Sequence, residues 1–265
     1  MVRSLSRTSS DGEWELRDKH DTLVGTADWL VVAGSGIAHP RWSDTFGGEP
    51  PLIAAEREHP DPNLREALDV IGTQRVSPVL AVFFSSSGSD ARKWLSLDYD
   101  VAEIRGDTIL SKVVIQGGKK DDGEEEWCSV VLHSTEAFAL ENVGVYGASS
   151  SAARIGDATT DASREEMLIE EMIRGLTRIP GMPEIDITEA ESKCDYGPVL
   201  HRWGNAFPKG EALSDELAFV PTSRVAFCGD YVASSEEARF GSFESALLSG
   251  TFAAEKIAKD ILEDQ

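Results

Sequence analysis

The amino-acid sequence predicts an α/β protein with two lobes. Apolar runs without alternation, such as 28–33, are typical of strands that helices cover on both faces. Shorter strand patterns bounded by glycine, serine or charged residues fill the middle of the chain, and two long two-faced helix patterns follow them. The 265 residues suffice to bury a sizeable core, so we expect one large domain with two lobes.

The charge balance excludes several kinds of partner. The chain has 25 basic and 47 acidic residues, and its net charge of −22 repels phosphate backbones and anionic membrane surfaces. We therefore expect an acidic, soluble protein with a small-molecule substrate, no nucleic-acid partner and no membrane partner; its oligomeric state is left open. The dense acidic run 121–126 is expected to form a solvated loop between strands.

The cysteines and the N-terminal residues bear on the compartment. Cys128, Cys194 and Cys228 are odd in number and far apart, so neither a disulfide framework nor a C-x-x-C site is visible, and a reducing compartment is expected. Residues 1–10 have no apolar core that could serve as a secretory signal, although their Arg and Ser content weakly resembles a transit peptide. We expect a protein that is not secreted, and the choice between cytoplasm and organelle interior stays open.

A lobe boundary is expected in a stretch rich in proline and glycine. Strands are predicted at 14–16 and 28–33, paired through a polar turn. The following residues, 34–62, are long enough to cross between lobes. The sequence thus predicts one lobe from residues 12–45 and 195–265 and a second lobe from residues 46–194.

The second lobe is predicted to contain a mixed, mostly antiparallel sheet covered by helices. Asp61 caps a helix that has Pro62 at its first position. The capping-box pattern of Ser163 and Glu166 begins another helix, which ends at Pro180. Strand patterns occupy 79–84, 109–116, 127–133 and 185–190. Two further strands, at 198–203 and 224–228, fall in the first lobe.

The C-terminal helix pattern mixes large and very small residues on the stripe expected to be buried. The stripe consists of Phe240, Phe243, Leu247, Gly250, Ala254, Ile257 and Ile261. Small residues near the helix start, among them Ser245 and Ser249, would let backbone or a flat ligand approach closely. This composition is unusual for a helix that only fills a core.

A strand that ends in Gly229-Asp230, a loop of about ten residues and a helix opening at Gly241 bring a carboxylate to free backbone N–H groups. Helix N-termini accept electron-rich groups, because their first amides are unpaired and the macrodipole is positive there. An acidic side chain at a strand end can hold sugar hydroxyls. By chemistry alone, an ordinary strand–loop–helix connection with a capping aspartate explains the same residues.

This order of residues resembles the flavin-binding C-terminal segment of FAD-dependent amine oxidases of the renalase-like kind. The resemblance covers residues 224–262 and implies that Asp230 faces the ribityl or phosphate oxygens of FAD. It also implies that the amides of Ser242 and Phe243 point at the flavin pyrimidine edge, where negative charge develops on reduction. FAD is the implied cofactor, with seven contact residues: Gly229, Asp230, Gly241, Ser242, Phe243, Glu244 and Ala246.

A weaker resemblance to the substrate lobe of the same family extends upstream of this segment. Trp203 and Asn205 look like the family's strand that reaches the active-site face, which implies substrate-binding roles for them. A tryptophan between strands is also typical of a core. No catalytic side chain is named, because in such sites the flavin carries the chemistry.

The family's N-terminal Gly-x-Gly-x-x-Gly turn, which binds the ADP half of FAD, is missing from these residues. The nearest candidate, Gly34-Ser-Gly36, lacks the third glycine, and Pro40 forbids the following helix, so we interpret it as a loop that connects the lobes. The resemblance therefore implies a two-lobed FAD-dependent amine oxidase-like fold with an incomplete flavin-binding lobe. His39, His133 and His201 have no ligand spacing, and no metal site is expected.

Three hypotheses follow. The first is an FAD-dependent oxidoreductase that transfers a hydride from an amine or a reduced nicotinamide-type substrate to flavin. The second is a truncated, non-catalytic relative that acts as a binding or partner protein. The third is that a separate chain supplies the ADP half of the cofactor site.

Overall fold

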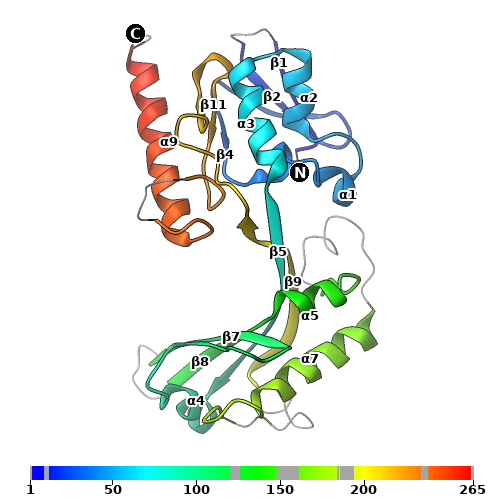
Figure 1. The fold of residues 1–265 in the computed structure, drawn as a ribbon, viewed down its shortest axis with the longest axis vertical. Coiled ribbons are helices and arrows are strands. Elements are labelled where there is room, and N and C mark those ends of the chain that lie inside the picture. The colour runs from blue at the N-terminus through cyan, green and yellow to red at the C-terminus, as the bar shows by residue number, and fades with distance from the viewer. Residues whose placement is uncertain are drawn as a thin grey trace. The chain divides into compact units, whose positions relative to one another are not determined.

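The computed structural model describes residues 2–8, 12–119, 126–147, 161–183, 185, 194–233 and 238–263 (Figure 1). The chain divides into two compact units, Met1–Val76 with Phe207–Gln265 and Ser77–Ala206. The first boundary thus lies at Val76 rather than at residue 45, because helices that follow residue 45 bury Leu52 and Leu64 in the same core as Val32 and Phe227. The roles predicted for the two lobes remain predictions.

The first unit contains two three-stranded sheets and the helices that pack on them. Its first sheet has the order β1-β2-β3 and is antiparallel, and its second has the order β10-β11-β4. In the second sheet, β4 and β11 are parallel, with Leu30 opposite Val225 and Val32 opposite Phe227. The elements are β1 (Ser4–Arg7), β2 (Trp14–Arg17), β3 (Leu23–Ala27), β4 (Leu30–Val32), η1 (Ser35–Ala38), α1 (Trp42–Phe46), α2 (Pro51–Glu58), α3 (Pro62–Thr73), β10 (Phe219–Val220), η3 (Pro221–Ser223), β11 (Val225–Phe227) and α9 (Phe243–Glu263).

The predicted pairing of strand 14–16 with strand 28–33 is wrong. The polar turn after β2 leads back into β3, and Trp14 lies opposite Ala27. Strand β4 instead enters the second sheet, where it pairs with a strand almost 200 residues later in the sequence. Such a non-local partner leaves no periodic signal in the sequence.

Helices cover both faces of β11, whereas β4 is buried on one face, because Val31 is 49 % exposed. Val225 and Phe227 of β11 point into the core that α2 and α3 share, whereas Ala226 packs with Ala253 of α9 on the other face. Figure 1 shows α9 alongside β11. Alternate residues of a strand point to opposite faces, so β11 is buried by layers on both sides. The expectation that helices cover both faces of the run 28–33 is wrong, since Val31 and Ala33 are exposed.

The start of α3 confirms a prediction from the sequence. Asp61 accepts hydrogen bonds from the amides of Asn63 and Leu64 at 2.9 and 3.4 Å, and Pro62 occupies the first turn. The second carboxylate oxygen accepts hydroxyl hydrogen bonds from Thr222 and Ser223, each at 2.6 Å. Burial alone would raise the pKa of Asp61, but these four hydrogen bonds outweigh it and hold the pKa below 3.8.

In the described residues of the second unit, helices accompany a five-stranded sheet with the order β6-β7-β8-β5-β9. The pairs β6–β7, β7–β8 and β8–β5 are antiparallel, which confirms the predicted strand direction for this part of the sheet. The predicted strand 185–190 lies outside the described residues, apart from Ile185. The elements are β5 (Arg75–Ser87), α4 (Gly88–Leu95), β6 (Val101–Glu103), β7 (Leu110–Lys119), β8 (Glu126–Ser134), α5 (Glu136–Glu141), α7 (Ala162–Leu176) and β9 (Tyr196–Lys209), of which β5 and β9 extend into the first unit.

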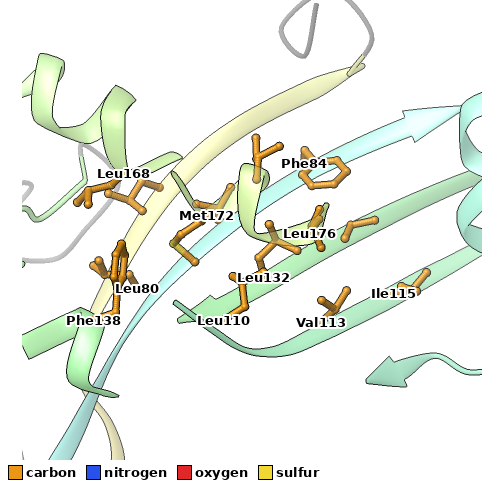
Figure 2. Close-up of a cluster of buried hydrophobic side chains, with 14 of the residues drawn as sticks. Leu80, Phe84, Leu110, Val113, Ile115, Leu132, Phe138, Leu168, Met172 and Leu176 are labelled. Atoms are coloured by element: carbon orange, nitrogen blue, oxygen red, sulfur yellow. The ribbon is translucent and has the colours of Figure 1, made fainter. Parts of the chain in front are cut away.

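The core of this unit lies between one face of the sheet and helix α7. Figure 2 shows Met172 and Leu176 among side chains of the sheet, including Leu110 and Leu132. On β8 the buried residues alternate along the strand, as expected for a sheet with one helix-covered face. The helix begins two residues earlier than the capping-box pattern predicted, because Asp161 rather than Ser163 accepts the capping hydrogen bond from the Arg164 amide at 3.1 Å.

Across the parts of the chain that the structure describes, none of the helices has the length and apolar character needed to cross a membrane. The same residues contain no group of three or more His, Cys, Asp or Glu side chains placed to hold a metal ion.

Candidate flavin-end site

The Gly229-Asp230 pair lies in a tight turn directly after β11. The amide of Val232 donates to the carbonyl of Gly229 at 3.2 Å and closes this turn, which places Asp230 and Tyr231 at its two central positions. Gly229 has φ +123, a conformation that glycine adopts readily and other residues do not. Because β11 and β4 are parallel, the turn lies at the same sheet edge as the loop that begins at Gly34.

The first turn of α9 is attached to this strand-end turn. The amide of Gly241 donates to the carbonyl of Asp230 at 3.0 Å. Gly241 has φ +79, and a Cβ there would lie 3.4 Å from the ring of Pro208. A glycine with positive φ at this position lets the chain turn from the loop into the helix, and the hydrogen bond places the helix N-terminus next to Asp230.

Ser242 caps α9, and two amides of its first turn are free. The Ser242 hydroxyl accepts from the Ser245 amide at 3.1 Å, and the Ser242 amide donates to the Arg239 carbonyl at 3.0 Å. The predicted role of the Ser242 amide at a flavin edge therefore needs correction, since that amide already has a partner. Among the described residues, the amides of Phe243 and Glu244 have no acceptor, so they are the two donors available to a ligand.

The Asp230 carboxyl is half-buried and needs hydrogen-bond donors. Burial raises its pKa above 3.8, and a hydrogen bond from its own backbone amide opposes that shift only in part. No described cation forms an ion pair with it. A partly desolvated carboxylate of this kind is stabilised by hydrogen-bond donors of a ligand, such as hydroxyl groups, which replace its lost hydration.

The outer face of α9 differs from the expectation. Phe243 and Leu247, which the sequence assigned to a buried stripe, are 83 % and 57 % exposed. The face that is buried carries Ser245, Ser249 and Ala253 instead. The interpretation of the small residues as allowing close backbone approach is confirmed, because Ser245 and Ser249 both bond to the strand-end turn. The large apolar side chains at the helix start remain available to a ligand or a partner.

A network of buried polar groups also holds the turn at residues 229–232. The Tyr231 hydroxyl donates to the Val32 carbonyl at 2.6 Å, and its pKa is raised well above 10 by burial. The Gln74 side chain donates to the Tyr231 carbonyl at 3.0 Å. The Gln74 carbonyl in turn lies 2.9 Å from Nε2 of His39 and accepts from Arg41 at 3.0 Å. Sequence analysis missed this network, because its members have no common spacing.

We predict that the ring of His39 titrates below pH 6.5. Its Nδ1 accepts a hydrogen bond from the Arg41 amide at 2.9 Å. Protonation at Nδ1 would therefore place its N–H opposite the Arg41 N–H, and the hydrogen bond would be lost. Burial is the largest cause of the lowered pKa, and the charge of Arg41 adds to it, while the hydrogen bond to Gln74 opposes it. The unfolded chain therefore takes up the proton first, and stability present above pH 6.5 is lost as pH falls toward the lowered pKa. Titration of the ring by NMR measures this directly, and a midpoint at or above 6.5 contradicts it.

The two predicted substrate residues lie in the second unit. Trp203 and Asn205 are on β9, two residues apart and hence on the same face of the sheet, and both are exposed. Trp203 is 55 % exposed and its ring contacts that of His201, with centroids 4.4 Å apart. Trp203 is thus not a core residue of this unit, and its substrate role remains a prediction.

These residues fit the flavin end of FAD better than its adenosine end. Two free amides, a partly buried carboxylate to which the described residues supply no ion-pair partner, and an exposed apolar helix start match a polar, flat ring with a hydroxylated chain. The loop after β4, in contrast, forms the 3₁₀ helix η1 and then the five-residue helix α1, so no long helix N-terminus faces a pyrophosphate there. The residues present therefore favour one half of the cofactor.

Comparisons with known proteins give a likeness in structure. No protein-family model matches the chain, and no curated protein matches it. Among solved structures, it is similar to cyclohexylamine oxidase from Brevibacterium oxydans IH-35A, with 14% sequence identity and a TM-score of 0.49. The likeness covers 98% of this chain and 48% of that one, so the chain spans about half the length of the structure it matches.

Proposed function

We propose that this chain provides the flavin-end and substrate-side parts of an FAD-dependent oxidoreductase of the amine oxidase, renalase-like family. The observation that carries the proposal is the junction of Asp230 with the N-terminus of α9. The Gly241 amide bonds the Asp230 carbonyl, so Asp230 lies next to the start of α9, where the amides of Phe243 and Glu244 are free.

The proposed roles follow from the chemistry of these groups. A bound flavin would accept a hydride from the C–N bond of an amine or from a reduced nicotinamide. The carboxylate of Asp230 would accept hydrogen bonds from ribityl hydroxyls. The amides of Phe243 and Glu244 would donate to electron-rich atoms of the ring, where the helix dipole also favours negative charge. Trp203 and Asn205 would contact the substrate.

We expect replacement of Asp230 by alanine to weaken binding of FMN and FAD by about tenfold or more, the usual loss when a hydrogen bond to a charged group is removed. Titration of flavin fluorescence against protein measures the dissociation constant. Glu216→Ala, which removes an exposed carboxylate from the same unit, is the matched control and should leave the constant unchanged. Equal affinity of the Asp230 variant and the unsubstituted protein, or no flavin binding by the latter, would overturn the proposal.

A second candidate function is that of a non-catalytic binding or partner protein. It is favoured by the exposed apolar residues Phe243, Leu247 and Leu248 on α9. Competition with ADP separates the candidates. Flavin binding that ADP does not weaken indicates a flavin-end site whose adenosine half comes from elsewhere, and the mass of the purified complex then shows whether a second chain supplies it. A chain that binds a protein partner but no flavin supports the second candidate.

A further inference from the structure

Two buried serines of α9 hold both ends of the 229–232 turn. The Gly229 amide donates to the Ser249 hydroxyl oxygen at 3.0 Å, and that hydroxyl lies 3.1 Å from the carbonyl of Gly229. One helical turn earlier, the Ser245 hydroxyl donates to the Val232 carbonyl at 2.9 Å. Both serines are only 1 % exposed. The pair therefore joins the first and last residues of the turn to one face of the helix.

These hydroxyls are not explained by packing alone. Residues four apart lie on one helix face, and the next member of the series after Ser245 and Ser249 is the buried Ala253. An apolar methyl group thus suffices where α9 packs on the sheet. Serine is a poorer helix former than alanine, and its buried hydroxyl must be satisfied. Its presence at the two positions opposite the turn indicates a role toward the turn.

The hydrogen bonds fix the backbone on both sides of Asp230. The carbonyl of Asp230 accepts from Gly241, and the turn closes from Val232 to Gly229. Ser249 links this turn to the body of α9, about one and a half helical turns beyond the free amides of the helix start. If its hydroxyl is removed, the buried Gly229 amide loses its acceptor, and the turn must shift or admit water to satisfy it.

We propose that Ser249, together with Ser245, is a positioning residue. It fixes the position of the Asp230 carboxylate relative to the free amides of Phe243 and Glu244. This inference rests on the proposed function, since the relative position of the carboxylate and the amides matters only to a ligand that contacts both. Ser249 sets the affinity for the flavin end of FAD without touching it.

The test compares Ser249→Ala with Thr251→Ala in the full chain. Thr251 lies on the same helix, is exposed, and donates to the Leu247 carbonyl at 3.1 Å, so its replacement removes a hydroxyl that does not reach the turn. Three quantities are measured for the folded proteins: hydrogen exchange of the Gly229 amide, the NMR titration of the Asp230 carboxyl, and the dissociation constants of FMN and FAD.

For Ser249→Ala we expect exchange at Gly229 to accelerate by about tenfold or more, the titration midpoint of Asp230 to move, and both flavin dissociation constants to rise by about tenfold. Thr251→Ala should match the unsubstituted protein in all three. If Ser249→Ala does not fold, Ser245→Ala is measured instead, and the Asp230 titration midpoint and both flavin dissociation constants are expected to change in the same directions.

Two negative results have different meanings. A variant with faster Gly229 exchange but an unchanged Asp230 titration and unchanged flavin affinity assigns Ser249 a purely structural role and overturns the inference. An unsubstituted protein that binds neither FMN nor FAD overturns the proposed function, and the Asp230 titration alone then decides whether Ser249 positions the carboxylate.

Discussion

Replacement of Gly229 by alanine is expected to lower the free energy of unfolding of the first unit by about 4 kcal/mol, the sum of a backbone-strain cost and an overpacking cost. With φ at +123, any side chain is strained at this position. A Cβ would also lie 2.7 Å from the carbonyl oxygen of Ala33 and 3.0 Å from the ring of Tyr231. Neither neighbour can yield, because one is backbone and the other is a buried ring whose hydroxyl bonds to Val32. Hydrogen exchange of β4 and β11 amides measures the loss.

Gly250→Ala is a matched control, for which we expect a change in stability of the opposite sign. It lies inside α9, and a Cβ there would meet no atom within 4 Å. Gly250→Ala is therefore expected to raise the stability of the same unit by about 0.5–1 kcal/mol, through helix propensity and a less flexible unfolded chain. A Gly229→Ala variant as stable as the unsubstituted protein would show that the turn tolerates a side chain, and would remove the argument that this glycine is required where the strand ends.

Elements defined by local rules were predictable from the sequence. The cap and proline at the start of α3 are encoded within four consecutive residues, and the strand patterns of β7 and β8 are bounded by turn residues on each side. Their hydrogen bonds depend on neighbours that are close in the sequence or joined by one turn. Such elements need no knowledge of the rest of the fold.

The burial of α9 could not be predicted in this way. Hydrophobic periodicity assigned Phe243 and Leu247 to the inside, but the helix packs through Ser245, Ser249 and Ala253. The hydroxyl groups make this possible, because they replace the backbone hydrogen bonds that the strand-end turn lacks. Polar residues that bond to distant backbone carry no periodic signal, so the sequence pattern pointed to the wrong face.

The candidate site was predictable only in part, for a similar reason. The order of Gly229, Asp230 and Gly241 is visible in the sequence, and the structure joins them through one hydrogen bond. Which amides are free depends on the cap, and Ser242 uses its own amide to close the preceding turn. The boundary of the first unit likewise depends on whether α2 and α3 bury their apolar faces in the core of the first unit or of the second. Local composition does not determine this choice.

Replacement of Leu132 by alanine is expected to destabilise the second unit by about 3–4 kcal/mol, within the range for large-to-small changes in a well-packed core. Leu132 is fully buried on β8, in the cluster that also contains Leu110, Met172 and Leu176 (Figure 2). The cavity that this substitution leaves would lie between the central strand β8 and α7. The hydrogen-bonded sheet on one side of the cavity cannot collapse into it. Hydrogen exchange of the β7 and β8 amides reports the change.

Val131 supplies the control, because it is the next residue on the same strand and points to the opposite, partly exposed face. Val131→Ala removes two methylene equivalents of apolar surface where no enclosed cavity forms, and its expected cost is about 1 kcal/mol. The difference between the two variants isolates the contribution of α7, since both keep the same β8 backbone pairing. Equal effects of the two substitutions would mean that α7 does not close this face of the sheet, and the assignment of the core to that side would be wrong.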